Sequence, residues 1–277
     1  MPKCIFPMSI PRPKKGGATD SKDRIEIPCG RCAYCLQRKR NEWFVRLKTE
    51  QKYSDYTYFI TLTYNEENLK YGNETAILHK PDLQGFFKRL RKRCKVRYFA
   101  VGEYGTTTFR PHYHSIIFTD KNSSDITKYI ANAWTFGNVD VKLVEDAMLN
   151  YVTKHQLYNY DKDKFEVQPF RLISSRPYIG YMFIEKYKDY YDEIKLTTKV
   201  EGITYNLPRI YRSKLYSQDS LREYNERRNS EAVSPQDVQN FNEKLKDDNY
   251  FKRLVDDYEQ YKSSLIKRSK KHTNQTI

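Results

Sequence analysis

A short apolar segment with two histidines in front of it places the strongest constraint on this fold. Ser115 to Phe118 is rich in Ile and Phe and follows His112-Tyr113-His114, a pattern that predicts a buried strand. Because side chains alternate across a strand, the two imidazoles leave one face about 6–7 Å apart, while Tyr113 leaves the other. Two nitrogen donors at that spacing can hold a divalent cation with coordination positions left open. Two structural histidines in a half-buried strand are the alternative.

The periodicity of the rest of the chain predicts strands and helices in alternation. Strands are expected at 57–64, 96–103, 112–118 and 138–144, and helices at 34–53, 81–93, 125–134 and 145–158. The two middle strands form a hairpin around the polar loop 105–110, and residues 16–22 form another loop. Strands joined by a hairpin, with helices between the others, indicate an α+β fold: a mainly antiparallel central sheet covered by helices.

Composition divides the chain into three expected parts. Residues 1–35 are a Cys-rich segment, and residues 36–215 carry the predicted sheet. Residues 216–277 are nearly free of Gly and rich in charge, which predicts an appended helical tail with a helix start at Ser234-Pro235. Only positive charges occur from Lys262 to His272, a composition typical of disorder.

The net charge of +15 favours a polyanionic partner. The 25 Tyr and 14 Phe residues add flat rings on which unpaired bases stack between cations. No apolar run approaches the ~18 residues of a membrane-spanning helix, and the amino terminus lacks a signal-peptide core. We therefore expect single-stranded nucleic acid, and no membrane, as the partner.

The cysteines suggest a second metal site. Cys29, Cys32 and Cys35 are spaced as Cys-x-x-Cys-x-x-Cys, and Cys4 is a fourth thiol nearer the amino terminus. In a chain without signs of secretion, such a set favours tetrahedral zinc over disulfides. Reduced cysteines packed in a cap are the alternative.

The last helix of the predicted sheet region brings a phenol and an ammonium together. At about 100° per residue, Tyr151, Lys154, His155 and Tyr158 share one helix face. Phenol has a pKa of about 10 and is a poor nucleophile at neutral pH. A cation that polarises a target phosphate, together with an ammonium beside the phenolate, would lower the barrier to attack.

Together these motifs resemble the HUH-type, single-strand-nicking replication initiators, in particular those of small single-stranded DNA phages of the Microviridae, gokushovirus branch. The resemblance runs from Cys4 to about Leu215 and rests on segments 28–35, 59–64, 102–105, 110–114, 151–154, 175–180 and 207–211.

The resemblance implies a mechanism. His112 and His114 would hold Mg²⁺ or Mn²⁺ against the scissile phosphate, and Tyr151 would attack it. A 5′-phosphotyrosine link and a free 3′-hydroxyl would result. Host replication machinery would extend the hydroxyl from the phage origin in the host cell cytoplasm, and a second transfer would reclose the circle.

Glu103 is the expected third ligand, because a hard cation prefers oxygen. It must lie opposite His112 or His114 in the hairpin, since a one-residue slip would turn it to the other face. Gln156 and Asp120 are weaker candidates.

The chain departs from the phage pattern after Tyr151. Related initiators carry a second tyrosine one helical turn later, where this chain has His155. Tyr158 is a candidate substitute, although it lies about 5 Å further along the helix axis than the missing tyrosine. The cycle with two tyrosines therefore does not follow, and one tyrosine per subunit, with a second subunit or a second round of binding, is the preferred interpretation. Tyr158 as the principal nucleophile is the alternative.

Further residues are candidates for DNA contact. They are Thr61, Thr63, Arg110, Arg176, Arg209 and Arg212. Each could equally be solvated surface, and phosphate contacts of this kind would weaken with salt.

Other functions fit the same motifs. One is a single-tyrosine HUH transposase or plasmid initiator. Another is a noncatalytic, zinc-stapled protein that binds single-stranded nucleic acid. The origin sequence and the oligomeric state do not follow from the sequence.

Overall fold

The structure is a computed structural model that describes residues 4, 7–13, 19–73, 75–154, 165–231, 253, 256, 257, 259, 260, 263 and 264. Contacts divide the chain into two compact units. Residues 40–215 form one, here called the sheet unit, and residues 1–39 with 216–277 form the other, here called the terminal unit.

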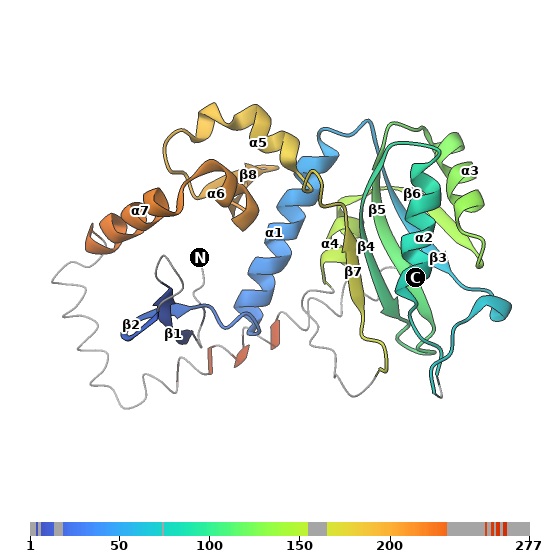
Figure 1. Cartoon of the computed structure of the whole chain (residues 1–277), viewed down its shortest axis with the longest axis horizontal. Coiled ribbons are helices and arrows are strands. Elements are labelled where there is room, and N and C mark those ends of the chain that lie inside the picture. The colour runs from blue at the N-terminus through green and yellow to red at the C-terminus, as the bar shows by residue number, and fades with distance from the viewer. Residues whose placement is uncertain are drawn as a thin grey trace. The chain divides into compact units, whose positions relative to one another are not determined.

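The sheet unit is built on five antiparallel strands (Figure 1). They are β3 (Tyr56–Thr63), β4 (Val96–Tyr104), β5 (Pro111–Thr119), β6 (Val139–Leu143) and β7 (Phe170–Ile173). Their order is β6-β3-β5-β4-β7, so β5 with its two histidines is the central strand. The expected α+β fold with an antiparallel sheet is confirmed.

Helices cover both faces of this sheet (Figure 1). On one face lie α2 (Lys80–Arg91) and α3 (Ser123–Ala133), whose apolar residues pack with those of β3 and β4. On the other face lie α4 (Asp146–Lys154) and the later turns of α1 (Ala33–Gln51). Pro81 in its first turn starts α2, and the Asn122 side chain caps α3 by accepting from the Asp125 N–H.

The alternation in β5 sorts its side chains between these two cores. Tyr113 and Ile117 belong to the core under α2 and α3, and Ile116 and Phe118 belong to the core under α1 and α4. Tyr113 therefore leaves the face opposite the histidines, as the strand pattern predicts.

Smaller elements complete the sheet unit. They are η1 (Glu66–Asn68), α5 (Tyr181–Tyr187), η2 (Asp189–Tyr191), the hairpin β8 (Thr197–Val200) with β9 (Ile203–Asn206), and α6 (Arg209–Leu215). Sequence patterns did not predict these elements or β7.

The terminal unit contains an antiparallel hairpin of β1 (Met8–Pro13) and β2 (Thr19–Ile27), the start of α1, and α7 (Gln218–Glu231). The loop expected at 16–22 is wrong in part, because residues 19–22 belong to β2, where Thr19 and Asp20 pair with Pro13 and Arg12 of β1. The tail helix begins at Gln218, and the helix start expected at Ser234-Pro235 lies outside the described residues. Among the described residues, no helix has the length and apolarity needed to cross a bilayer.

Candidate metal and nucleophile site

The register of the β4–β5 hairpin brings the expected ligands together. Glu103 pairs directly with His112, and two residues further along β5 His114 pairs with Val101. Directly opposed residues of an antiparallel pair point to the same face. Glu103 therefore shares a face with both imidazoles, on the side covered by α4.

One oxygen of Glu103 meets both histidines. Its Oε1 lies 3.2 Å from His112 Nε2 and 2.9 Å from His114 Nε2. The three potential ligand atoms lie within 4.8 Å of one another. The Glu103 side chain is only 4% exposed, against 19% for His112 and 11% for His114. A buried carboxylate needs nearby positive charge, because burial alone strongly disfavours the ionised form.

The second nitrogen of each imidazole is bonded to the protein. His112 Nδ1 lies 3.0 Å from the Arg110 carbonyl oxygen, and His114 Nδ1 lies 3.0 Å from Thr61 Oγ1. These contacts leave both Nε2 atoms directed at Glu103. Burial acts to lower the pKa of His112, but the Glu103 carboxylate and the Arg110 carbonyl outweigh it, so the pKa is raised.

Tyr151, which lies on α4, contacts the same oxygen of Glu103. Its hydroxyl donates a hydrogen bond of 2.8 Å to Glu103 Oε1. Its ring meets His114 edge-on, with centroids 5.2 Å apart, and Phe59 likewise at 6.3 Å. The structure thus places a phenol hydroxyl beside the paired imidazoles.

Packing and charge fix the helix that carries Tyr151. Leu149 and Val152 of α4 are fully buried in the core that α4 shares with α1. Arg40 of α1 donates to Asn150 Oδ1 at 2.8 Å, and Lys48 of α1 pairs with Asp146 at 2.7 Å. Contacts at the first residue and at the middle of α4 therefore limit rotation of the helix.

Other candidates on this helix are only partly visible. Lys154 is the last residue of α4, one turn beyond Tyr151. His155, Gln156 and Tyr158 lie outside the described residues. Asp120 follows β5 at the end away from His112 and pairs with Lys121.

Two of the expected DNA contacts have partners within the protein. Thr61 bonds His114, and the Arg110 guanidinium pairs with Glu66 and donates to the Tyr64 carbonyl oxygen at 2.7 Å. Thr63 pairs with His112 across the β3–β5 ladder. Both threonines are half-buried on the histidine face of the sheet.

The expected arginine contacts lie elsewhere in the sheet unit. Arg176 is exposed in the segment after β7, Arg209 is exposed at the start of α6, and Arg212 is half-buried in that helix.

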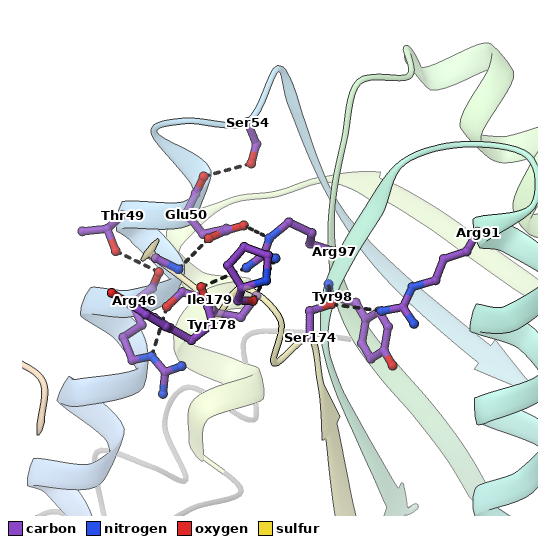
Figure 2. Close-up of polar contacts among 12 residues, drawn as sticks. Arg46, Thr49, Glu50, Ser54, Arg91, Arg97, Tyr98, Ser174, Tyr178 and Ile179 are labelled. Carbon is purple, nitrogen blue, oxygen red and sulfur yellow. Dashed lines mark hydrogen bonds and ion pairs between the residues drawn. The ribbon is translucent and has the colours of Figure 1, made fainter. Parts of the chain in front are cut away.

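Sequence reasoning missed the polar contacts that fix the segment carrying Arg176 (Figure 2). Glu50 of α1 is buried, pairs with Arg97 of β4 and accepts the Gly180 N–H. Arg97 also donates to the carbonyl oxygens of Pro177 and Tyr178 at 2.9 and 3.0 Å. From the sequence, Glu50 is only a charged residue in a predicted helix and Arg97 only one in a predicted strand. Neither residue indicates that the other is its partner.

The four cysteines of the terminal unit form a compact cluster. Sγ atoms of Cys4 and Cys32 lie 3.9 Å apart, as do those of Cys29 and Cys35, and all four sulfurs lie within 4.8 Å of one another. All four are free thiols. Zinc–sulfur bonds of about 2.3 Å in a tetrahedron place sulfurs about 3.8 Å apart. The cluster therefore has the dimensions of a four-cysteine metal site.

The chain is an α+β domain whose antiparallel sheet carries two histidines and a glutamate beside a helix tyrosine, the arrangement expected from the resemblance to HUH-type initiators. Residues 57–157, which include all four of these side chains, match the protein family described as replication-associated protein ORF2/G2P.

Relatives from three phages extend the comparison. The chain is 27% identical to replication-associated protein VP4 of Bdellovibrio phage phiMH2K over 67% of its length and 68% of that protein. It is 25% identical to replication-associated protein ORF4 of Chlamydia phage 1, over 70% and 55%, respectively. It is 30% identical to replication-associated protein ORF2 of Spiroplasma virus 4, over 46% and 47%. The matched regions thus span from about half to two thirds of these relatives.

A solved structure also matches. The hypothetical protein ORF119 from Sulfolobus islandicus rod-shaped virus 1 is 23% identical, with a TM-score of 0.29, over 45% of this chain and 96% of that one. A TM-score this low does not establish a common fold. The sequence matches confirm the resemblance drawn from the motifs: the chain is similar to replication-associated proteins of small phages.

Proposed function

We propose that this chain is a metal-dependent DNA nickase and strand transferase that starts rolling-circle replication of a phage genome. The observation that carries the proposal is the meeting of His112, His114 and Tyr151 at one oxygen of Glu103. The similarity to phage replication-associated proteins supports the biological setting.

The donor set at Glu103 fits a divalent cation. A carbonyl oxygen can only accept, so His112 Nδ1 carries the proton that reaches Arg110, and the neutral ring has a bare lone pair at Nε2. That lone pair faces a carboxylate oxygen at 3.2 Å, which is unfavourable unless a proton or a cation lies between them. Two imidazole nitrogens and a carboxylate leave open positions for water and a phosphate.

We assign Mg²⁺ or Mn²⁺ to this site. When bound, the cation would supply positive charge at the scissile phosphate. The buried Glu103 balances part of that charge, and its burial limits the water around it.

Tyr151 is the proposed nucleophile. The Tyr151 hydroxyl loses its proton and its oxygen forms a bond to the scissile phosphorus. The bond from phosphorus to the 3′ oxygen breaks and that oxygen takes up a proton, which leaves a 5′-phosphotyrosine and a free 3′-hydroxyl. One phosphoester bond is exchanged for another, so the step needs no nucleotide cofactor. Lys154, one helical turn later, is proposed to stabilise the phenolate with its ammonium group.

The remaining assignments follow from the same reaction. Host polymerase would extend the 3′-hydroxyl in the cytoplasm of the infected cell. Arg176, Arg209 and Arg212 are proposed to contact DNA phosphates. The cysteine cluster is proposed to hold structural Zn²⁺, because its sulfurs have the spacing of a tetrahedral site.

Covalent attachment to DNA tests the function. Full-length protein is incubated with Mn²⁺ and origin-bearing single-stranded DNA labelled on either side of the nick. We expect an adduct with the DNA on the 3′ side of the cut, and its loss in Tyr151→Phe with DNA binding retained. Tyr205→Phe is the matched control, because Tyr205 packs against the same core as Tyr151, and it should form the adduct normally.

Two other outcomes would contradict the proposal. An adduct that persists in Tyr151→Phe would move the nucleophile to another tyrosine. Tight DNA binding without any adduct, unchanged in His112→Ala, would support a noncatalytic nucleic-acid-binding protein instead.

A further inference from the structure

The two imidazoles of the site are oriented by groups of different chemistry. A backbone carbonyl, which only accepts, bonds His112, whereas the Thr61 hydroxyl, which both donates and accepts, bonds His114. This difference determines which ring nitrogen can carry the proton of each histidine when a cation binds.

The Arg110 carbonyl oxygen requires a proton on Nδ1 of His112. This nitrogen must donate to the oxygen whether or not a metal is bound. Nε2 is therefore the nitrogen of this ring that can bind a cation, and the bond at Nδ1 need not change when it does.

His114 needs two arrangements. In the neutral ring without a cation, Nε2 carries the proton and donates to Glu103 Oε1 at 2.9 Å, so Nδ1 has a lone pair and accepts from Thr61. A cation at Nε2 requires the lone pair there, which puts the ring proton on Nδ1, and Nδ1 must then donate. Thr61 Oγ1 can accept that bond without moving, because only its hydroxyl hydrogen rotates.

Packing keeps the ring in place during this change. Phe59 stacks on the His114 ring with centroids 5.1 Å apart, and Tyr151 closes its edge at 5.2 Å. Phe59 and Thr61 both come from β3, which pairs with β5 directly. The ring can therefore exchange its proton position without swinging away from Glu103.

We propose that Thr61 is a positioning residue whose hydroxyl reverses its hydrogen bond to His114 when the cation binds. One proton leaves Nε2 for solvent and another arrives at Nδ1, so His114 stays neutral. The proposal rests on the metal site described above and replaces the expected role of Thr61 in DNA contact.

Metal affinity in four variants tests it. Mn²⁺ binding is measured by titration with the full-length protein. Thr61→Val keeps the β-branched shape but loses the hydroxyl, so affinity should fall by about 10- to 100-fold. Thr61→Ser restores the hydroxyl and should bind nearly as the wild type does.

Thr63→Val is the matched control. Thr63 lies on the same strand face and pairs with His112, whose Nδ1 is already bonded to a carbonyl. Its loss should leave Mn²⁺ affinity unchanged. His112→Ala removes a proposed ligand and should abolish Mn²⁺ binding at the site. This variant tests the metal site itself, whereas the Thr61 variants test the positioning role of Thr61.

A second readout follows the protons directly. Long-range proton–nitrogen NMR spectra at pH 8 should show the His114 proton on Nε2 without metal and on Nδ1 with saturating Mg²⁺. His112 should keep its Nδ1 proton in both states.

Thr61→Val with wild-type affinity, or His114 with its proton on Nδ1 before metal is added, would overturn the role of Thr61 while the metal site stands. Wild-type protein that binds no Mn²⁺, or His112→Ala that binds it equally well, would overturn the metal site itself.

Discussion

At the scale of single residues, the sulfurs of the cysteine cluster differ in their readiness to ionise. Burial acts to raise the pKa of the Cys29 thiol, but N–H groups of Arg31 and Cys32 and neighbouring thiols lower it to about 6. Burial and neighbouring sulfurs instead raise the pKa of Cys35 to about 12. Cys29 is therefore more readily ionised than Cys35, and a cation among the sulfurs would favour ionisation of the others.

Cys29→Ser should prevent binding of the proposed structural zinc. The variant loses the sulfur whose pKa is lowered, and we expect the zinc content of purified protein to fall from about one per chain to a small fraction of that. Elemental analysis of the purified protein measures the change. Cys94→Ser is the control, because Cys94 is buried in the sheet unit and bonds the Leu90 carbonyl oxygen. Equal zinc content in the two variants would contradict the assignment.

Residue-level prediction from sequence succeeds where a simple period determines geometry. The strand period of two puts His112 and His114 on one face, and the hairpin loop then aligns Glu103 with them. The bond from Thr61 to His114 joins residues 53 positions apart and depends on how β3 pairs with β5. No local pattern carries that information, so Thr61 was expected to contact DNA instead.

At the scale of elements, long strands and helices of the sheet unit are predictable and short ones are not. Strands β3, β4 and β5 have eight or nine residues with clear alternation. Strands β7, β8 and β9 have four residues each, too few for a period to stand out. Their positions are decided by tertiary contacts, as with Glu50, which binds residues 47 and 130 positions away.

Glu50→Gln should destabilise the sheet unit. The substitution leaves Arg97 without its charged partner and weakens the acceptor for the Gly180 N–H (Figure 2). Removing one partner of a largely buried ion pair should lower the free energy of unfolding by about 3 kcal/mol. Urea denaturation followed by circular dichroism measures this. Lys142→Gln, which breaks an exposed pair with Asp140, should change stability by less than about 0.5 kcal/mol. Equal effects would show that the Glu50 pair does not hold the segment after β7.

At the scale of the whole molecule, the net charge of +15 favours electrostatic attraction to the phosphates of DNA. A cation-rich surface binds a phosphate backbone mainly by releasing its counterions, and this attraction is independent of base sequence. In the proposed function, sequence preference at the origin would come from other contacts, so nonspecific affinity and origin choice should respond differently to salt.

The affinity for single-stranded DNA should fall steeply as salt rises. Each phosphate contact contributes about −0.7 to the slope of log affinity against log salt concentration. Arg176→Gln should therefore reduce the slope by about 0.7 and weaken all DNA sequences alike. Lys121→Gln removes the same charge from a residue paired with Asp120, so it controls for net charge and should leave the slope unchanged. Fluorescence anisotropy with origin and scrambled oligonucleotides between low and moderate salt measures both. If the two variants give equal slopes, Arg176 acts only through the overall field of the protein and makes no phosphate contact of its own.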